Sequence, residues 1–487
     1  MTEPAPQVTA EERRLIVGGA LIAMMLAALD QTIVAPALPT IGAALGEPAW
    51  LPWVISAYFL TATAVTPLYG KLADLKGRRV VLMAAIGIFV AGSVVCALAP
   101  GMAVLIVGRA VQGLGGGGLI ALAQTIIADV VPPRERSTYM VYVTAVWAFA
   151  SLAGPVVGGV LAQHLDWTLI FWINLPLAAA AIVMTDRTLR KLPVSRRDQT
   201  LDVAGAVLVV LATVALMLAL TWGGVRYAWG SAPILALLAA SLLLFALFAR
   251  HLGTRAEPLI PPRVLKNPVV AAATASMFFA MIAFVGLSVY LPLYQVMVQG
   301  LDAAGAGIAL VAFMIGTVAG ANTAGRAMRT VRRYRRLPVA GALLALAALV
   351  LLAAVAPTAS FVSVEILIFL VGAGIGTLFP VATISVQNAV DTADLGVATG
   401  TLSFMRSLGS VIGVAVLGAV LLGYGVVETI GEAAGHGSVE PERAAAAGTA
   451  FRSLFLVAAG AEAIALVFLL MMRQLPLRGA PPPAATE

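Results

Sequence analysis

The sequence predicts an all-α integral membrane protein with fourteen transmembrane helices. Of its 487 residues, 61% are hydrophobic and only 11% are charged, whereas a soluble domain carries about 25% charged residues. The apolar residues form runs of about 20, the length at which a helix rising 1.5 Å per residue crosses a ~30 Å hydrocarbon core. A helix satisfies its backbone hydrogen bonds within the segment, and the runs lack the alternation of a β-strand.

The apolar runs set the order of the expected spans. They cover residues 15–38, 51–69, 80–99, 103–127, 137–163, 168–186, 202–222, 232–250, 268–292, 303–325, 337–356, 361–387, 396–424 and 451–472. The first run lacks a convincing cleavage site, so it is expected to remain as a span. An even number of spans places both termini on one side of the membrane.

Lysine and arginine indicate which side that is. One set of loops holds 25 of the 30 basic residues, including the loop 70–79 and the arginine-rich run 326–336; the other five are Arg109, Arg226, Arg406, Arg443 and Arg452. Basic loops remain in the cytoplasm. The sequence therefore predicts a multi-pass protein of the plasma (inner) membrane with cytoplasmic N- and C-termini.

A weak internal repeat divides the chain. The basic loop 70–79 recurs at 325–336, and Gly113, Gly115 and Gly117 recur as Gly372, Gly374 and Gly376. The expected parts are an N-terminal six-helix bundle (1–187), two extra helices with their linkers (188–267), a C-terminal six-helix bundle (268–472) and a cytoplasmic tail (473–487). Repeated bundles of this kind imply a central site with alternating access.

Several function classes are disfavoured. The net charge of +7 comes from the basic loops, so a nucleic-acid partner is not expected. Cys96 is the only cysteine, and the histidines lie at span ends or in an outer loop, so neither a metal site nor a cofactor is expected. The loops contain no nucleophile–base set of an enzyme and no phosphate-binding P-loop, so ATP is not the expected energy source.

Four motifs carry a resemblance to a known family. They are Gly70-Lys-Leu-Ala-Asp-Leu-Lys-Gly-Arg-Arg79, Arg109-Ala-Val-Gln-Gly-Leu-Gly115, Gly154-Pro155-Val-Val-Gly158-Gly159 and Leu29-Asp-Gln-Thr-Ile-Val34. In their order along the chain, which begins with the motif 29–34, the motifs resemble the major facilitator superfamily, and within it the fourteen-span drug:proton antiporters of the multidrug efflux type. The chain departs from the family pattern at Ala35, Pro36 and Ala150.

The resemblance implies a proton-coupled antiporter that exports lipophilic drug-like molecules by alternating access, and it thereby implies a role in antibiotic resistance. The energy source would be the proton gradient, and the partners would be small lipophilic substrates and membrane lipids. Whether a periplasmic adaptor takes part is left open. Two other functions are also left open: export of a dedicated metabolite or lipid, and a transport-inactive receptor or scaffold.

Asp30 and Arg109 are the expected proton-coupling residues. A charge inside the membrane is costly, so such a residue has a partner or a function. Counting from the span ends places Asp30 roughly 22 Å from the cytoplasmic edge and Arg109 roughly 9 Å below the outer edge, which are similar depths. Gln112 lies one helical turn from Arg109 and is expected to complete the network. The alternative is structural: Asp30 fixes a helix and Arg109 caps backbone carbonyls.

The loop 70–79 is expected to act as a conformational latch, built from Gly70, Asp74, Gly77, Arg78 and Arg79. A helix N-terminus favours a nearby anion, so Asp74 is expected to face one. The basic side chains also suit lipid phosphates. A loop that only directs topology is the alternative.

The remaining site residues belong to three groups. The small residues Gly154, Gly158 and Gly159, with Pro155, suit close helix packing and are expected to form an antiporter seam. Substrate-cavity candidates are Gln112, Gln124, Trp147, Asn322 and Arg406. Arg406 and Glu462 have similar depth on consecutive spans, which predicts a structural charge pair; the alternative is that Arg406 faces the cavity.

Overall fold

The computed structural model describes residues 9–45, 50–131, 133–190, 202–224, 226–255, 258–301, 303–328, 334–356, 360–424 and 441–476. Within these ranges the regular elements are helices, apart from one isolated bridge between Gly223 and Tyr227. Thirteen of the described helices are long and apolar enough to cross a membrane. The expected span 51–69 lies in α3 (Leu51–Lys76), whose 26 residues also reach across a bilayer. The all-α fold with about fourteen spans is therefore confirmed.

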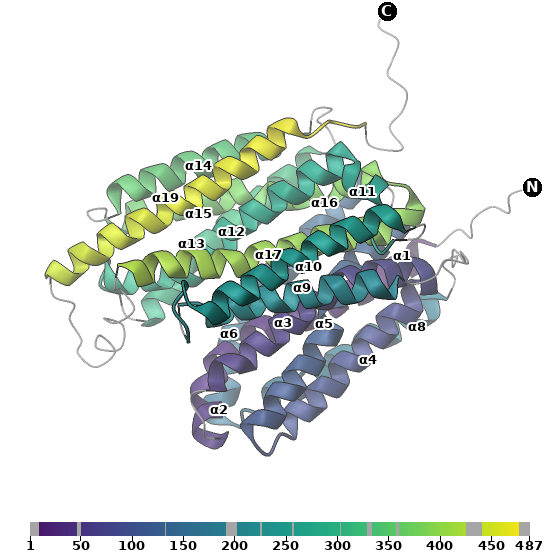
Figure 1. The fold of residues 1–487 in the computed structure, drawn as a ribbon, viewed down its shortest axis with the longest axis horizontal. Coiled ribbons are helices and arrows are strands. Elements are labelled where there is room, and N and C mark those ends of the chain that lie inside the picture. The colour runs from purple at the N-terminus through teal and green to yellow at the C-terminus, as the bar shows by residue number, and fades with distance from the viewer. Residues whose placement is uncertain are drawn as a thin grey trace, which may run out of the picture. The chain divides into compact units, whose positions relative to one another are not determined.

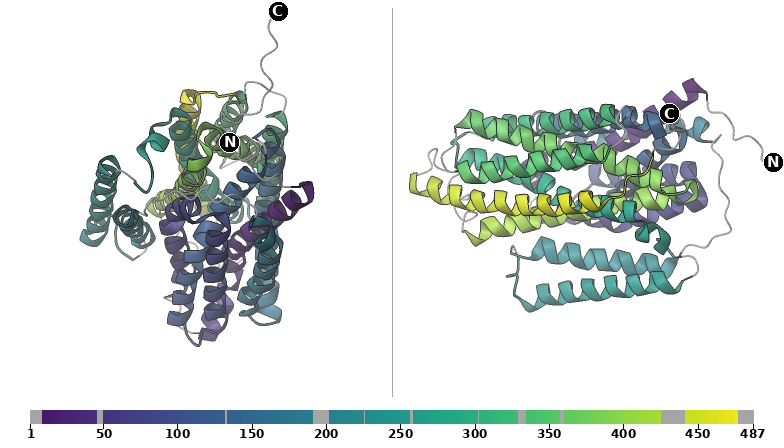
Figure 2. Two further views of the ribbon diagram at one scale, coloured as in Figure 1. Left: turned by 90° about the vertical axis from the view of Figure 1, so that its right-hand side faces the viewer. Right: turned by 90° about the horizontal axis from the view of Figure 1, so that it is seen from above.

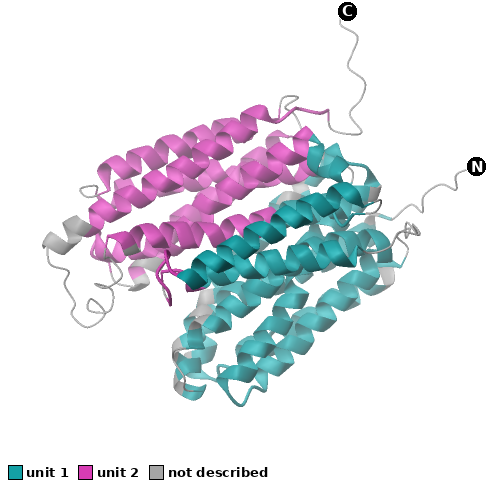
Figure 3. Ribbon diagram, in the orientation of Figure 1, with its two compact units in different colours: residues 1–221, 232–267, 387–404 teal, residues 222–231, 268–386, 405–487 magenta. Residues whose placement is uncertain are grey.

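The described helices form two compact units, which Figure 3 shows in different colours. Unit 1 comprises residues 1–221, 232–267 and 387–404, and unit 2 comprises residues 222–231, 268–386 and 405–487. Parts of the chain named in the sequence analysis lie outside the described residues: the linker 191–201, the basic run 329–333, most of the long outer segment at 425–440, and the tail beyond 476.

Unit 1 contains most of the first half of the chain, whose helices are labelled in Figure 1. Its elements are α1 (Ala10–Ile33), η1 (Ala35–Ala37), α2 (Leu38–Leu45), α3 (Leu51–Lys76), α4 (Arg78–Ala97), α5 (Met102–Val130), α6 (Pro133–His164), α7 (Leu169–Trp172), α8 (Asn174–Leu189), most of α9 (Val203–Trp222), α10 (Ala232–Thr254), α11 (Pro262–Lys266), η3 (Thr392–Asp394) and the start of α17 (Leu395–Gly423). The helix α5 packs against α3 and α4, while α1 packs against α5, α6 and α8.

Unit 2 contains most of the second half of the chain. Its helices are α12 (Pro268–Met297), α13 (Ala303–Ala327), α14 (Arg336–Val355), α15 (Phe361–Gly376), most of α16 (Leu378–Ala389), the rest of α17, and α19 (Pro441–Met471). The helix α15 packs against α13 and α14, and α19 packs against α12 and α14.

The repeated glycines bring helix backbones together in both units. A Cβ atom added at Gly113, Gly115 or Gly117 of α5 would meet the backbone of α3 or α4. At the matching positions of α15, which are Gly372, Gly374 and Gly376, it would meet the backbone of α13 or α14. The glycine triplet therefore performs the same packing in each half of the repeat.

Two helix boundaries differ from the sequence-based expectation. The first span was expected to reach residue 38, but α1 ends at Ile33 and a short 3₁₀ turn containing Pro36 follows, because proline cannot donate the next helical hydrogen bond. The last span was expected from residue 451, whereas α19 begins at Pro441. Hydropathy detects only the membrane-spanning part, and the polar, alanine-rich start of α19 is helical by propensity.

The two extra helices α9 and α10 run side by side, as the teal pair in Figure 2 shows. Ser241 Oγ of α10 donates a hydrogen bond to the Ala212 carbonyl of α9 at 2.9 Å. Much of the apolar surface of α10 stays exposed, with Leu235, Leu242 and Leu243 each more than half exposed. Such a surface suits contact with lipid chains.

Candidate functional site

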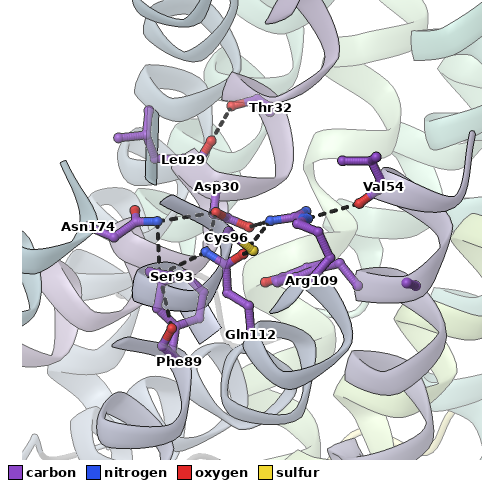
Figure 4. A network of polar contacts seen from close by, with 12 residues as sticks. Leu29, Asp30, Thr32, Val54, Phe89, Ser93, Cys96, Arg109, Gln112 and Asn174 are labelled. Carbon is purple, nitrogen blue, oxygen red and sulfur yellow. Dashed lines mark hydrogen bonds and ion pairs between the residues drawn. The ribbon is translucent and has the colours of Figure 1, made fainter. Parts of the chain in front are cut away.

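Asp30 and Arg109 form a buried ion pair in unit 1. Arg109 Nη1 lies 2.6 Å from Asp30 Oδ2, and both side chains are at most 1% exposed. The same nitrogen donates to Gln112 Oε1 at 2.6 Å, and Gln112 Nε2 donates to Asp30 Oδ1 at 2.7 Å. Figure 4 shows this closed triangle of side chains from α1 and α5.

A second set of contacts fixes the triangle. Asn174 Nδ2 of α8 lies 3.3 Å from Asp30 Oδ1, and Ser93 Oγ of α4 accepts from Gln112 Nε2 at 2.9 Å. Arg109 Nε donates to the Val54 carbonyl of α3 at 2.9 Å, and its guanidinium lies 4.5 Å from the Tyr58 ring centroid. Five helices therefore hold one ion pair.

The local structure explains the geometry. Arg109 and Gln112 are separated by three residues in the continuous helix α5, so they share a face. Asp30 lies in the last turn of α1 and is opposite this face. The sequence had indicated these three residues through their charge and spacing. It missed Ser93 and Asn174, for which the only signal was a polar residue within an apolar run.

The ion pair is enclosed by protein on all sides, because both side chains are at most 1% exposed. A charge-assisted pair in a low-dielectric site is strong, and removing one partner leaves the other charge uncompensated. Besides Asp30, the guanidinium of Arg109 contacts Gln112, the Val54 carbonyl and the Tyr58 ring. Arg109 therefore has polar partners that do not depend on the Asp30 charge.

The Asp74 latch, defined here as Asp74, Arg78, Asp129 and the first turn of α17, also lies in unit 1. Asp74 accepts hydrogen bonds from the backbone N–H groups of Gly396 at 3.1 Å and Val397 at 2.9 Å. These are N–H groups at a helix N-terminus, which lack partners within the helix and attract an anion. Arg78 pairs with Asp74 and, through Nε at 2.8 Å, with Asp129 of α5.

Three other motif residues have clear positions near the latch. A Cβ at Gly70 would meet the backbone of Gly396 and Val397, so glycine permits the close approach of α3 and α17. Gly77 has φ 87°, a left-handed conformation that favours glycine, at the junction of α3 and α4. Arg79 Nε donates to Asp186 Oδ1 of α8 at 2.9 Å, outside the latch itself.

The glycines of the expected seam pack α6 against α1. A Cβ at Gly154 would meet Thr32, and one at Gly158 would meet the Ile33 carbonyl, whereas Gly159 has only Pro36 at 4.0 Å. Thr32 Oγ1 donates to the Ala150 carbonyl at 2.7 Å and fixes the same contact. The side chain of Pro155 lies outside the described atoms. The structure places the seam residues within unit 1, and their role in sealing stays a prediction.

The other cavity candidates are distributed over both units. Gln124 is buried in α5, and Trp147 of α6 packs against the apolar cluster around Leu29 and Ile33. Asn322 lies in α13 of unit 2, where its Oδ1 is buried without a hydrogen-bond partner among the described residues. Their grouping around one cavity stays a prediction.

The expected pair of Arg406 and Glu462 is not formed. Glu462 is 1% exposed, and in the described part of the chain its Oε2 has no hydrogen-bond partner and no ion pair joins it to Arg406. Equal depth predicted the pair, but depth does not fix the direction in which a helix face points. The main packing partners of α19 are α12 and α14, rather than the preceding helix α17.

An apolar cavity of about 390 Å³ lies in unit 1 between α1, α6 and α8. Its lining consists of Leu21, Ile22, Met25, Leu29, Val146, Phe149, Ala153, Val157, Ile173 and Leu177, none of which is polar. The volume is within the range of small-molecule sites. Leu29 lines the cavity, whereas Asp30, the next residue of α1, and Arg109 do not.

The many membrane-spanning helices, together with a buried ion pair and an apolar cavity within unit 1, indicate the class of protein, a membrane transporter. Residues 20–414 match the model of the Major Facilitator Superfamily. The chain belongs to this superfamily.

Relatives at similar identity carry transporter names. The uncharacterised MFS-type transporter Rv1877 of Mycobacterium tuberculosis is 32% identical, with 97% of this chain and 71% of the relative covered. The multidrug transporter protein MdtP of Bacillus subtilis is also 32% identical, covering 84% and 75%. The efflux pump FUS6 of Gibberella moniliformis is 31% identical, covering 86% and 76%.

Solved structures share the fold at low sequence identity. The human organic anion transporter MFSD10 aligns with a TM-score of 0.62 and 17% identity, covering 92% of this chain and 99% of that one. A bacterial homologue of the iron transporter ferroportin aligns with a TM-score of 0.64 and 13% identity, covering 94% and 98%. These likenesses confirm the transporter fold.

Proposed function

We propose that the chain is a proton-coupled antiporter that exports lipophilic small molecules by alternating access. The observation that carries the proposal is the fully buried Asp30–Arg109 pair with its Gln112 bridge. The names of two relatives, a multidrug transporter and an efflux pump, support the export direction and the substrate class. The protein lies in the plasma membrane with cytoplasmic termini, and the proton gradient supplies its energy without a cofactor.

The proton and the conformational change are linked through Asp30. In the ionised state Asp30 holds Arg109 and Gln112 of α5 against α1. Protonation weakens this attachment, so the relative stability of the two conformers depends on whether the proton is bound. The Asp74 latch stabilises one of these conformers by holding the N-terminus of α17.

The direct test replaces Asp30 by asparagine and measures transport in proteoliposomes under an imposed pH gradient. Asp30→Asn keeps the shape and removes the titration, so concentrative transport should be lost while insertion and the gel-filtration profile stay unchanged. Asp30→Glu should retain part of the activity because it keeps a titratable group. Glu11→Gln, at an exposed carboxylate of the same helix, is the matched control. Full concentrative transport by Asp30→Asn would rule out Asp30 as the coupling site.

The proposed substrate class rests on the apolar cavity between α1, α6 and α8. Its lining has no polar or charged side chain, so binding there depends on apolar contact. Asp30 is already neutralised by Arg109 or, in the other state, by a proton. Neutral or monocationic lipophiles therefore fit better than dications.

A matched series of mono- and dicationic compounds tests this substrate class in the same proteoliposomes. We expect the monocations to exchange at least several-fold faster, because a second charge would have to be desolvated without an anionic partner. Faster exchange of the dications would show that another acid lines the binding site. If only one metabolite or lipid of a broad panel is transported, the protein is a dedicated exporter instead. Transport of none would favour a receptor or scaffold.

A further inference from the structure

The N-terminus of α17 is held by a second contact in addition to Asp74. Arg263 of α11 binds Asp394, the last residue of η3, through two hydrogen bonds of 2.9 Å, from Nε to Oδ2 and from Nη2 to Oδ1. Asn267 Nδ2 donates to the Ala389 carbonyl at 2.9 Å in the same region. The segment that ends in the first turn of α17 is therefore attached to the linker 258–267.

The other end of this linker is attached to the two extra helices. Asp202, which precedes α9, accepts from the Leu259 N–H at 3.2 Å with Oδ2. Its Oδ1 accepts from the Gly205 N–H at 2.9 Å and lies 2.8 Å from His251 Nε2 of α10. Burial alone would raise the pKa of Asp202, but the Gly205, His251 and Leu259 donors outweigh it and lower the pKa.

The linker itself is packed rather than loose. Leu259 and Ile260 are at most 5% exposed, and Val264 of α11 is 2% exposed. These three side chains have little empty space to relax into, so a displacement of the linker is felt by the residues packed against them.

We propose that Arg263 is a positioning residue: it holds the N-terminus of α17 in place for Asp74 and thereby makes α9 and α10 part of the Asp74 latch. The extra helices then influence which conformer is stable without lining the substrate cavity. The inference rests on the proposed function only in that the latch selects a transport conformer. The contacts that carry it lie within unit 1.

The expected effect of removing the Arg263–Asp394 ion pair depends on how far the pair is exposed to solvent. The Arg263 side chain is 64% exposed and that of Asp394 is 12% exposed. Such an ion pair contributes modestly, although the two parallel hydrogen bonds favour its geometry. Loss of the pair should shift the latch equilibrium roughly two- to fivefold, whereas loss of the Asp74 charge should shift it more.

The test measures release of α17 directly. Val397 is 3% exposed and its N–H binds Asp74, so Val397→Cys in a Cys96→Ala background should react with a maleimide only when the latch opens. Asp74→Asn should speed labelling strongly. Arg263→Gln and Asp394→Asn should each speed it roughly two- to fivefold, and the swap Arg263→Asp with Asp394→Arg should restore the parent rate. Lys266→Gln, at an exposed cation of the same helix, is the matched control and should have no effect.

Asp202→Asn tests the link to the extra helices and should also speed labelling, by less than Arg263→Gln. If Arg263→Gln labels like Lys266→Gln, or if the swap does not restore the rate, the positioning role is overturned. A faster rate in Arg263→Gln but not in Asp202→Asn would overturn the part assigned to α9 and α10. Labelling needs neither substrate nor gradient, so the same series in an Asp30→Asn background separates failure of this inference from failure of proton coupling.

Discussion

At Glu462 a carboxyl group lies inside unit 2, fully buried and without a hydrogen bond to Oε2 from any described residue. An unpaired charge in such a place costs several kcal/mol, so the site accommodates the neutral acid far better than the carboxylate. Glu462 thus contrasts with Asp30, which has three polar partners at equal burial.

This contrast gives a prediction at the scale of one residue. Glu462→Gln should keep the melting temperature of the parent, because the amide replaces a neutral acid of the same shape. Glu462→Ala should lower the free energy of unfolding by about 2 kcal/mol, because it leaves a cavity. This variant serves as the positive control for the melting assay. A large loss in Glu462→Gln that Arg406→Gln reverses would instead reveal the ion pair that the sequence had predicted.

At the same scale, the sequence identified the residues whose chemistry is unusual in a membrane. Asp30 and Arg109 were predicted because a charge within a span is costly without a purpose. Gln112 was predicted from its spacing of one helical turn from Arg109, and Asp74 from the loop motif 70–79. Asn174 and Ser93 were missed because neutral polar side chains are common in spans and become informative only when their direction is known.

At the scale of the helix, spans were easier to predict than their ends or neighbours. Apolar runs fix the membrane-spanning part, but proline at residue 36 and alanine-rich polar sequence at 441 decided where α1 and α19 end and begin. The failed Arg406–Glu462 pair has the same origin, since consecutive helices need not be packing partners. The glycine triplets, by contrast, indicated the internal repeat in the sequence, and in the structure they pack closely in both halves.

The helix α10 supports a test of the topology. Gly230 lies just before the start of this helix, and Gly253 lies near its end. Both glycines are exposed, and a Cβ at either position would have no atom within 4 Å. Cysteine at position 230 should therefore react with a membrane-impermeant maleimide from outside intact cells, and cysteine at position 253 only after the cytoplasmic side is opened. Both proteins need the Cys96→Ala background. Labelling of both from one side would contradict the fourteen-span arrangement.

At the scale of the whole molecule, composition, motif order and the internal repeat were sufficient for the class and the superfamily. They were sufficient because the membrane restricts the chain to helices of nearly fixed length. The same information did not reveal that residues 387–404 join unit 1, or that a linker connects them to the extra helices. Those contacts depend on polar groups outside the membrane-spanning runs, for which the membrane imposes no rule.

The apolar cavity has a consequence for how the protein adapts to new compounds. Lining residues such as Phe149 and Val157 belong to α6, whereas the ion pair is held mainly by α5 against α1, α3 and α4. Substitution of one apolar lining residue for another changes the shape of the cavity and leaves the polar contacts of Arg109 intact. For the proposed exporter, the range of exported molecules can therefore drift through single mutations under selection by an unfamiliar toxin, while the residues proposed to handle the proton are inherited unchanged.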